Sequence, residues 1–130
     1  MANELFRDAD HLSLPVLEGK KAGDPVRVGG LNGVCQTDRA NIGVAMLNAD
    51  GSPNTAYNWG GGNPDGHASV WLKGAHVFTV AFAVSNVGDP IYILANGSAL
   101  TGTATDNFLF GHALTTKSAA SGPLTVRITN

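Results

Sequence analysis

The sequence predicts an all-β fold, a compact β-barrel or β-sandwich of about nine short strands that is built from two related β units. Short runs of β-branched and aromatic residues alternate with turn residues along the whole chain. No window keeps the apolar spacing of an amphipathic helix for long before Gly or Pro interrupts it. A Gly-Asp-Pro turn that leads into an apolar run occurs twice. The length of 130 residues predicts a single β domain, residues 1–130.

Each predicted strand is a short apolar run between turn residues. Leu124, Val126 and Ile128 alternate with polar residues, which predicts a strand with one face buried and one face wet. The run Ile91–Leu94 is apolar on both faces, so it should lie more centrally. In chain order, the predicted strands are Leu12–Leu17, Pro25–Val28, Gly33–Gln36, Ile42–Leu47, Ala68–Leu72, Val77–Val84, Ile91–Leu94, Phe108–Leu114 and Leu124–Thr129.

A long Gly-rich loop, predicted at Asn48–Gly66, interrupts this rhythm. A loop of this length is uncommon in a small domain unless it has a function. It contains Tyr57 and Trp59, aromatic residues of the kind that anchor protein interfaces. The alternative is that Trp59 folds back as a plug on one end of the barrel.

The first residues, 1–10, are polar and mixed in charge apart from the apolar pair Leu5 and Phe6. They fit a frayed terminus, and they equally fit an N-terminal arm that packs on a neighbour through Phe6. The sequence leaves both interpretations open.

The two Gly-Asp-Pro turns indicate an internal duplication. Gly23–Val28 resembles Gly88–Ile93, and His11 and His76 stand at the same distance before the leading glycines. Asp caps such a turn and Pro fixes φ at the start of a strand. Downstream, Ile42-Gly43-Val44-Ala45 is matched with Phe110-Gly111-His112-Ala113, and a glycine inside a strand indicates a bulge or a close backbone approach.

The charge pattern argues against nucleic acid and membranes as partners. Charged residues make up 14% of the chain, against about 25% in a typical domain. The formal net charge is −2, and Lys20-Lys21 is the only basic pair, so there is no clustered positive footprint. The N-terminus lacks the pattern of a signal peptide and no apolar stretch is long enough to span a membrane, so we expect a soluble protein made in the cytoplasm.

No motif predicts catalysis, a metal or a cofactor. Cys35 is the single cysteine, and its strand-like surroundings favour a buried structural role. The four histidines form no i, i+4 pair that could start a zinc site. Gly60-Gly61-Gly62 is followed by no Lys-Ser or Lys-Thr, so it is not a phosphate loop. We therefore predict that the protein is not an enzyme, with no catalytic, metal or cofactor residues.

The order of these features resembles one known family. Lys21–Gly29 is followed by Leu31-Asn32-Gly33-Val34, then by Ala68–Phe78, Val87–Tyr92, Phe110–Ala113 and a closing Leu124–Ile128 strand. This order is similar to the phage capsid cement (head-decoration) family of small β proteins. The chain departs from the family pattern in the spread of one Gly-Val-Phe-like step over Gly74–Phe78, and in the Gly-rich loop.

The resemblance implies a structural virion protein on the outer surface of a tailed-phage capsid. Its partners would be the major capsid protein and further copies of itself, as a trimer first and a dimer second. The contact candidates are Phe6, Arg7, Tyr57 and Trp59. Two alternatives stay open: a phage tail or fibre module, and a carbohydrate-binding β-sandwich that uses Tyr57, Trp59 and Trp71.

Overall fold

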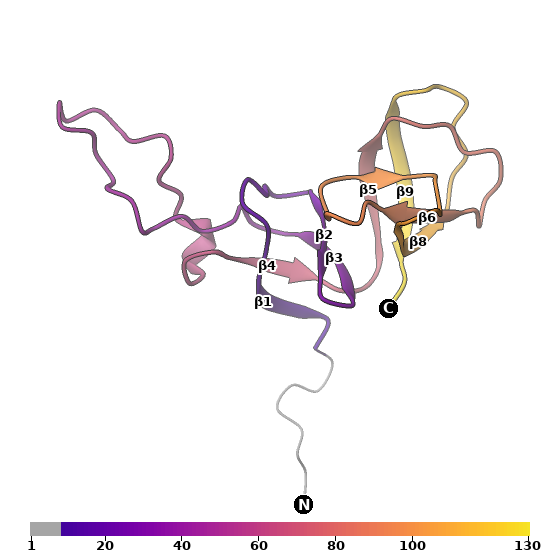
Figure 1. The fold of residues 1–130 in the computed structure, drawn as a ribbon, viewed down its shortest axis with the longest axis horizontal. Helices are drawn as coiled ribbons and strands as arrows, with labels where there is room; N and C mark the ends of the chain where they lie inside the picture. Colours follow the sequence, from indigo (N-terminus) through magenta and orange to yellow (C-terminus); the bar gives the residue numbers. More distant parts are fainter. Residues whose placement is uncertain (1–8) are drawn as a thin grey trace, which may run out of the picture.

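The protein folds into two antiparallel β-sheets that lie side by side along an elongated body (Figure 1). The computed structural model describes residues 9–130 and contains nine strands in that range. The first sheet has the strand order β1-β4-β3-β2, and the second has the order β5-β9-β8-β6-β7. The strands are β1 (His11–Pro15), β2 (Pro25–Val28), β3 (Leu31–Cys35), β4 (His67–Trp71), β5 (Ala75–Val80), β6 (Pro90–Ile93), β7 (Leu100–Thr101), β8 (Phe108–Ala113) and β9 (Gly122–Ile128).

The predicted all-β class is confirmed, and all but one of the predicted strands overlap an observed strand. The prediction for Ile42–Leu47 is wrong. These residues alternate between larger and smaller apolar groups as a strand does, but they join no sheet and are exposed. The strand Leu100–Thr101 was missed because its two residues are too few to show alternation.

The internal duplication is visible in the strand order. In each sheet the first strand of the unit pairs with the last, the last with the third and the third with the second, while β7 is an addition to the second unit. Equivalent hydrogen bonds close the two Gly-Asp-Pro turns. In the first turn, Gly23 N–H donates to Cys35 O (2.7 Å) and Cys35 N–H donates to Asp24 O (2.9 Å). In the second turn, Gly88 N–H donates to Ala113 O (2.6 Å) and Ala113 N–H donates to Asp89 O (2.9 Å). Two copies of one β unit therefore build the fold.

The prediction that Gly43 and Gly111 occupy equivalent places in the two units is wrong. Gly43 is not equivalent to Gly111, because Gly43 lies outside the sheets; the true equivalent is Gly33 in β3. A Cβ atom at Gly33 would lie 2.7 Å from the carbonyl oxygen of Trp71, and one at Gly111 would lie closer still to the carbonyl oxygen of Arg127. Both strands therefore approach the next strand too closely for a side chain.

The equal spacing of the two histidines does not reflect structural equivalence. His11 lies opposite Trp71 in the first sheet, whereas His76 lies opposite Val126 in the second. Arg127 is the equivalent of Trp71, and its partner is Ala75. The segment between the first strand and the Gly-Asp-Pro turn is therefore one residue longer in the second unit than in the first.

The apolar core has two clusters, and Val34 of β3 in the first sheet belongs to the cluster formed mainly by the second. The cluster of the second sheet is larger and includes Phe78 and Phe110, whose rings meet edge to face at 5.6 Å. In β9, Leu124, Val126 and Ile128 are buried and alternate with more exposed residues, which confirms the predicted half-buried strand. The smaller cluster of the first sheet contains Val26, Cys35, Ala68 and Val70.

Asn32 joins the two sheets. This residue is 3% exposed, and its side-chain amide donates to the carbonyl oxygens of Leu109 (2.9 Å) and Thr129 (2.8 Å) in the second unit. Its own Oδ1 accepts a hydrogen bond from Arg27 Nη1 at 2.7 Å. Asn130 completes the junction by donating to Asn32 O at 2.8 Å. Every polar atom of the buried amide is thereby satisfied.

Lys20 makes a second junction from a buried position. The sequence presents it as half of a basic pair, yet it is 6% exposed. Its Nζ donates to Pro25 O at 2.8 Å in its own unit and to Gly97 O at 2.9 Å in the other. Removal from water lowers the pKa of this ammonium, although nearby Asp24 acts in the opposite direction.

Cys35 is expected to resist thiol reagents in the folded protein. It is 2% exposed, and burial raises the pKa of its thiol from 9.0 to about 11. At pH 8 the native protein should not react with Ellman's reagent, whereas the urea-unfolded chain should react fully. An exposed control, Ser85→Cys, should add one fast-reacting thiol. Rapid reaction of native Cys35 would contradict the burial.

The raised pKa of the Cys35 thiol makes the free energy of unfolding depend on pH. The unfolded chain releases the thiol proton near pH 9.0, while the folded chain keeps it to about pH 11. Because the folded state then binds more protons, the contribution of Cys35 to stability is complete below pH 9 and is lost as the pH rises through this window. Replacement by alanine should reduce this alkaline loss in urea titrations at pH 8 and pH 11.

Candidate functional site

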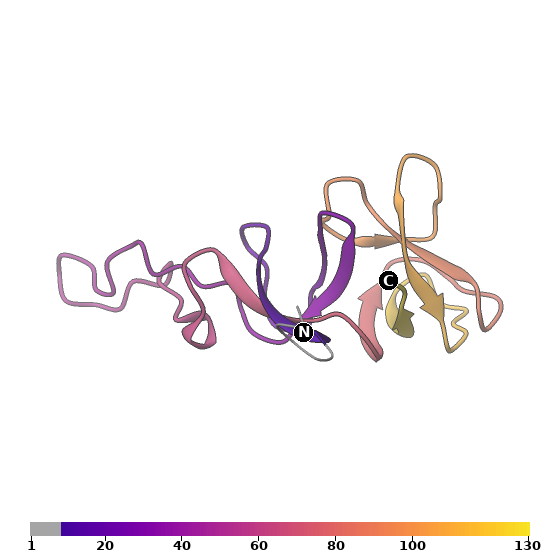
Figure 2. The same cartoon turned by 90° about the horizontal axis from the view of Figure 1, so that it is seen from below.

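A hairpin-like arm, residues 41–58, projects from the first sheet between β3 and β4 (Figures 1 and 2). Two isolated bridges hold it together, one between Asn41 and Asn58 at its root and one between Leu47 and Pro53 near its tip. In both views the arm extends away from the body of the protein.

Short polar contacts within the arm set its shape. The side chain of Asn54 donates to Ala45 O at 2.8 Å, and its backbone N–H donates to Met46 O at 2.9 Å. At the tip, the Asp50 carboxylate accepts hydrogen bonds from the backbone N–H (3.0 Å) and the hydroxyl (2.6 Å) of Ser52. These bonds lower the pKa of Asp50, so the carboxylate is ionised at neutral pH.

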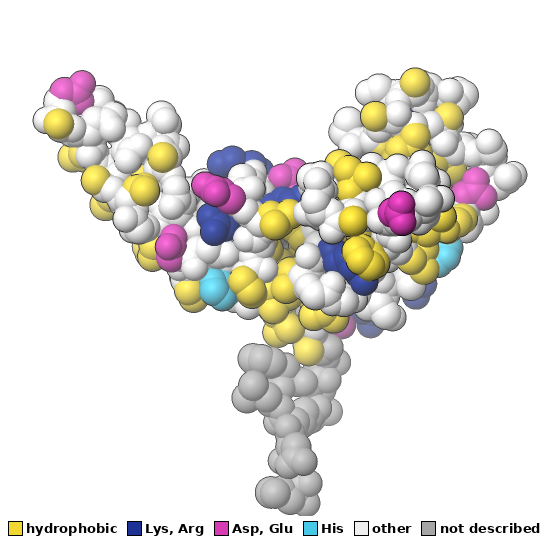
Figure 3. Space-filling view, viewed as in Figure 1, with side chains coloured by type: hydrophobic (Ala, Val, Ile, Leu, Met, Phe, Trp, Pro, Cys, Tyr) yellow, Lys and Arg dark blue, Asp and Glu magenta, His cyan; other side chains and the backbone are white. Residues whose placement is uncertain are grey.

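The arm buries none of its apolar side chains. Every residue from 42 to 53 is exposed. Its large apolar side chains are exposed by 41% at Ile42, 38% at Val44, 64% at Met46 and 57% at Leu47. Hydrophobic groups are scattered along the arm in Figure 3. Full burial of such a side chain is worth roughly 1.5–3 kcal/mol, and covering the part that is still exposed gains a fraction of this, so the arm presents surface suited to a partner.

The root of the arm is held rigidly. Ala40 is fully buried, and Gly60 packs on its backbone so closely that a Cβ atom at Gly60 would overlap it. Gly60 also has a φ of 59°, a conformation that favours glycine, and it begins the 3-10 turn η1 (Gly60–Gly62). Asn58 donates to Asp38 at 3.0 Å. The triple glycine therefore serves a close packing contact.

The structure places both aromatic candidates of the loop at this root. Trp59 is 65% exposed, so it does not plug the end of a sheet, and its ring lies beside Gly62. Tyr57 is half-buried. Trp71 does not extend this surface, because it lies at the last residue of β4, the end away from η1, where His11 stacks on its ring at a centroid distance of 4.5 Å. The other two candidates, Phe6 and Arg7, lie outside the described residues.

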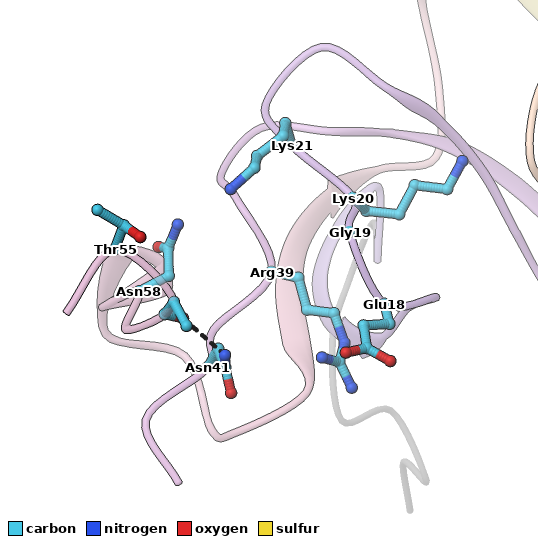
Figure 4. Close-up of a pocket in the computed structure, with 9 residues that line it drawn as sticks. Glu18, Gly19, Lys20, Lys21, Arg39, Asn41, Thr55 and Asn58 are labelled. Atoms are coloured by element: carbon cyan, nitrogen blue, oxygen red, sulfur yellow. Dashed lines mark hydrogen bonds between the residues drawn. The ribbon is translucent and has the colours of Figure 1, made fainter. Parts of the chain in front are cut away.

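A small cavity of about 190 Å³ lies where the arm leaves the body (Figure 4). Its charged lining residues have mixed signs: Glu18, Lys20, Lys21 and Arg39. Arg39 is engaged through Nε with Val16 O at 3.1 Å. Figure 4 shows the Lys20 side chain pointing away from the arm, consistent with its bonds to the second unit. The cavity therefore shows no convergent set of acid, base and nucleophile.

Within residues 9–130, no three His, Cys, Asp or Glu side chains come together as metal ligands would. In the same part of the chain, no helix is long and apolar enough to cross a membrane.

The projecting arm begins earlier in the chain than the sequence predicts. It begins at Asn41, whereas the predicted loop begins at Asn48, because the pattern of residues 42–47 predicts a strand. The prediction of a strand therefore did not identify the apolar side chains of this segment as exposed; they are Ile42, Val44, Met46 and Leu47. A usable signal is the glycine at position 43 in a segment with no charged residue before Asp50.

Comparison with known proteins gives one match. The family model described as "Phage cement protein" matches residues 6–129, nearly the whole chain. No curated protein matches the chain, and no solved structure does.

Proposed function

Because the chain belongs to the phage cement protein family, we propose that it binds the outer surface of the major capsid protein lattice and stabilises the assembled head. Proteins of this family are structural and non-enzymatic, and the match gives this chain the same capsid-decorating role. What we propose beyond this role is that the protein binds the outer face of the shell, that it stabilises the head, and that particular residues make the contact.

The arm is the observation that supports this function best. It is shaped by its own hydrogen bonds and leaves Met46 and Leu47 more than half exposed, and Trp59, the residue directly after the arm, is exposed to the same extent. An element with that exposure gains stability by covering its apolar side chains on another protein. In the proposal, Tyr57 and Trp59 at the arm root contact the shell, together with Phe6 and Arg7.

The mechanism is mechanical. A shell under internal pressure fails at the contacts between its subunits, and a decoration protein that spans these contacts adds buried area to each. A standard interface buries roughly 1,600 Å², and repetition over many symmetric sites multiplies a modest local affinity. Closed cyclic symmetry suits such sites, with a trimer as the first choice and a dimer as the second.

The whole chain, residues 1–130, acts as one β domain in this proposal. The hydrogen bonds of Asn32 and Lys20 across the two sheets support this, because separation of the sheets would leave buried polar groups unpaired. The Gly-rich insertion, predicted at 48–66, contributes the tip of the arm, the Trp59 side chain and η1.

Trp59→Ala is expected to weaken binding to heads without changing the fold. Truncation of an anchoring aromatic residue costs about 2 kcal/mol or more, which corresponds to roughly a thirty-fold loss of affinity. The measurement is co-sedimentation with heads that lack the protein, with the urea midpoint as a fold check. Val87→Ala, at a position of similar exposure (64%), should bind as the wild type does. Wild-type binding by Trp59→Ala would remove this residue from the contact surface.

Copy number tests the function itself. Quantitative mass spectrometry of purified particles should find this chain at a simple ratio to the major capsid protein, since a decoration protein occupies the lattice regularly. A few copies per particle would instead indicate a tail or vertex component. Absence from particles would refute the structural proposal.

A further inference from the structure

A groove lies between the two sheets on the side where the β2–β3 hairpin meets the second unit. It has a volume of about 280 Å³. The side chains of Leu17, Arg27 and Phe108 line it, together with the backbone-rich turns at Gly29 and 95–97. We call this feature the inter-sheet groove. Figure 3 shows basic and hydrophobic side chains side by side in the middle of the viewed face.

Among the residues that line the inter-sheet groove, Arg27 is the one charged side chain, and Leu17 and Phe108 are the two exposed apolar ones. Leu17 is 47% exposed and Phe108 is 45% exposed. The guanidinium of Arg27 lies over the Phe108 ring, 4.4 Å from its centroid, and donates to Asn32 at 2.7 Å. These two contacts fix the orientation of the guanidinium. Among residues 9–130, no Asp or Glu lines the groove.

The tip of the arm has the complementary chemistry. Asp50 is the only charged residue between positions 41 and 58, and Ser52 holds its carboxylate in place. Met46 and Leu47, a few residues before it in the hairpin, are 64% and 57% exposed. As successive residues of a paired segment, they face opposite sides of the arm. One face of the tip thus presents an exposed leucine near an oriented anion, which complements the single cation and the apolar side chains of the groove.

The other surface hollows fit the tip less well. The cavity at the arm root combines Glu18 with its basic residues, so a carboxylate entering it would meet a like charge. The hollow near the C-terminus contains Asp10, which forms an ion pair with Lys73 at 3.8 Å. The hollow at Lys117 has no carboxylate in its lining, but that ammonium already donates to two carbonyl oxygens. Charge complementarity therefore favours the inter-sheet groove.

We propose that the arm tip of one copy docks in the inter-sheet groove of a second copy of this chain. Asp50 pairs with Arg27, while Leu47 packs on Leu17 and Phe108. The arm extends away from its own body in both views, so the tip reaches a groove on another molecule (Figures 1 and 2). The contact joins two different surfaces, so successive copies close a ring or continue as a chain.

This inference deepens the proposed function, on which it rests, by naming a second copy as the partner of the arm tip while the arm root faces the shell. The two assignments separate experimentally. Changes at the tip should affect association between copies in solution, whereas Trp59→Ala should affect binding to heads.

Cysteine cross-linking tests the docking directly. A Leu47→Cys copy mixed with a Leu17→Cys copy under mild oxidation should give a disulfide-linked dimer. Native Cys35 is buried and does not compete. The matched control replaces Leu17→Cys with Val87→Cys, an exposed position away from the groove. A yield no higher than in this control would overturn the proposal.

A charge exchange tests the predicted pair. Asp50→Lys should weaken self-association by roughly tenfold in sedimentation equilibrium, since it sets two cations against each other. Mixing it with Arg27→Glu copies should restore association by forming the reversed pair. Urea midpoints check that Arg27→Glu still folds. If that variant is unfolded, Leu47→Ser replaces it, with the same roughly tenfold loss expected from a lost apolar contact.

The outcomes distinguish the two proposals. Asp50→Lys protein that loses self-association but still binds heads through its root supports the inference. Wild-type protein that stays monomeric at several hundred micromolar and gives no Leu47–Leu17 cross-link refutes the inference, while its binding to heads would leave the proposed function standing. Failure of the wild type to bind heads would refute the proposed function alone.

Discussion

Replacing Phe110 with alanine is expected to destabilise the protein by about 3–5 kcal/mol. Phe110 is fully buried and contacts the Phe78 ring edge to face in the cluster of the second sheet. Loss of the ring removes its transfer free energy and leaves a cavity that the surrounding strands fill only in part. Since a whole domain is stable by only about 5–15 kcal/mol, much of the stability would be lost.

Urea unfolding followed by circular dichroism measures this effect, and the melting temperature should fall by at least roughly 10 °C. Phe108→Ala is the matched control two residues away in the same strand, because its ring is 45% exposed. It should cost clearly less, with part of the loss coming from the contact with Arg27. Equal costs for the two substitutions would show that the core is not where the structure places it.

Replacing Gly111 with alanine is expected to distort the second sheet and to cost about 1–3 kcal/mol or more. The added methyl would overlap the carbonyl oxygen of Arg127 in β9, which is backbone and cannot move aside alone. Gly111 also adjoins a bulge. Ile91 lies opposite Gly111 and Tyr92 opposite Leu109, so Phe110 is the extra residue that the bulge directs into the core.

The control for this substitution is Gly30→Ala. A Cβ atom at Gly30 meets nothing within 4 Å, so the change should be neutral or slightly stabilising. Gly33→Ala should behave like Gly111→Ala, because its Cβ atom would meet the carbonyl oxygen of Trp71 at the equivalent place in the first unit. Full stability of Gly111→Ala by urea titration would contradict the close approach of β8 and β9.

The strands and the duplication could be predicted because their signals are local. The Gly-Asp-Pro turns fix their own geometry through Asp and Pro, and β9 shows its buried face by simple alternation. The choice of Gly43 in place of Gly33 failed because the match was made in sequence alone. What requires glycine at position 33 is the Trp71 carbonyl oxygen, which belongs to a distant segment.

The candidate site could be predicted only in part. Tyr57 and Trp59 stood out as aromatic residues among glycines, and the structure places both at the root of a projecting arm. Residues 42–47 were misread because an exposed apolar arm has the same alternation as a half-buried strand, and only the missing sheet partner distinguishes them. The buried roles of Lys20 and Asn32 depend on residues far along the chain, so no local pattern reveals them.

The pairing of the first strand with the last in each unit has a consequence for the time course of folding. Neither sheet can close until its final strand exists, so long loops must be closed before the strand contacts form, and such topologies fold in milliseconds to seconds. During synthesis the first unit is complete once Trp71 has emerged, before any strand of the second is available. The side chain of Asn32 can bond to Leu109 and Thr129 only after both have been synthesised. The contacts that join the two units at Asn32 therefore form last, when the C-terminal end of the chain has emerged.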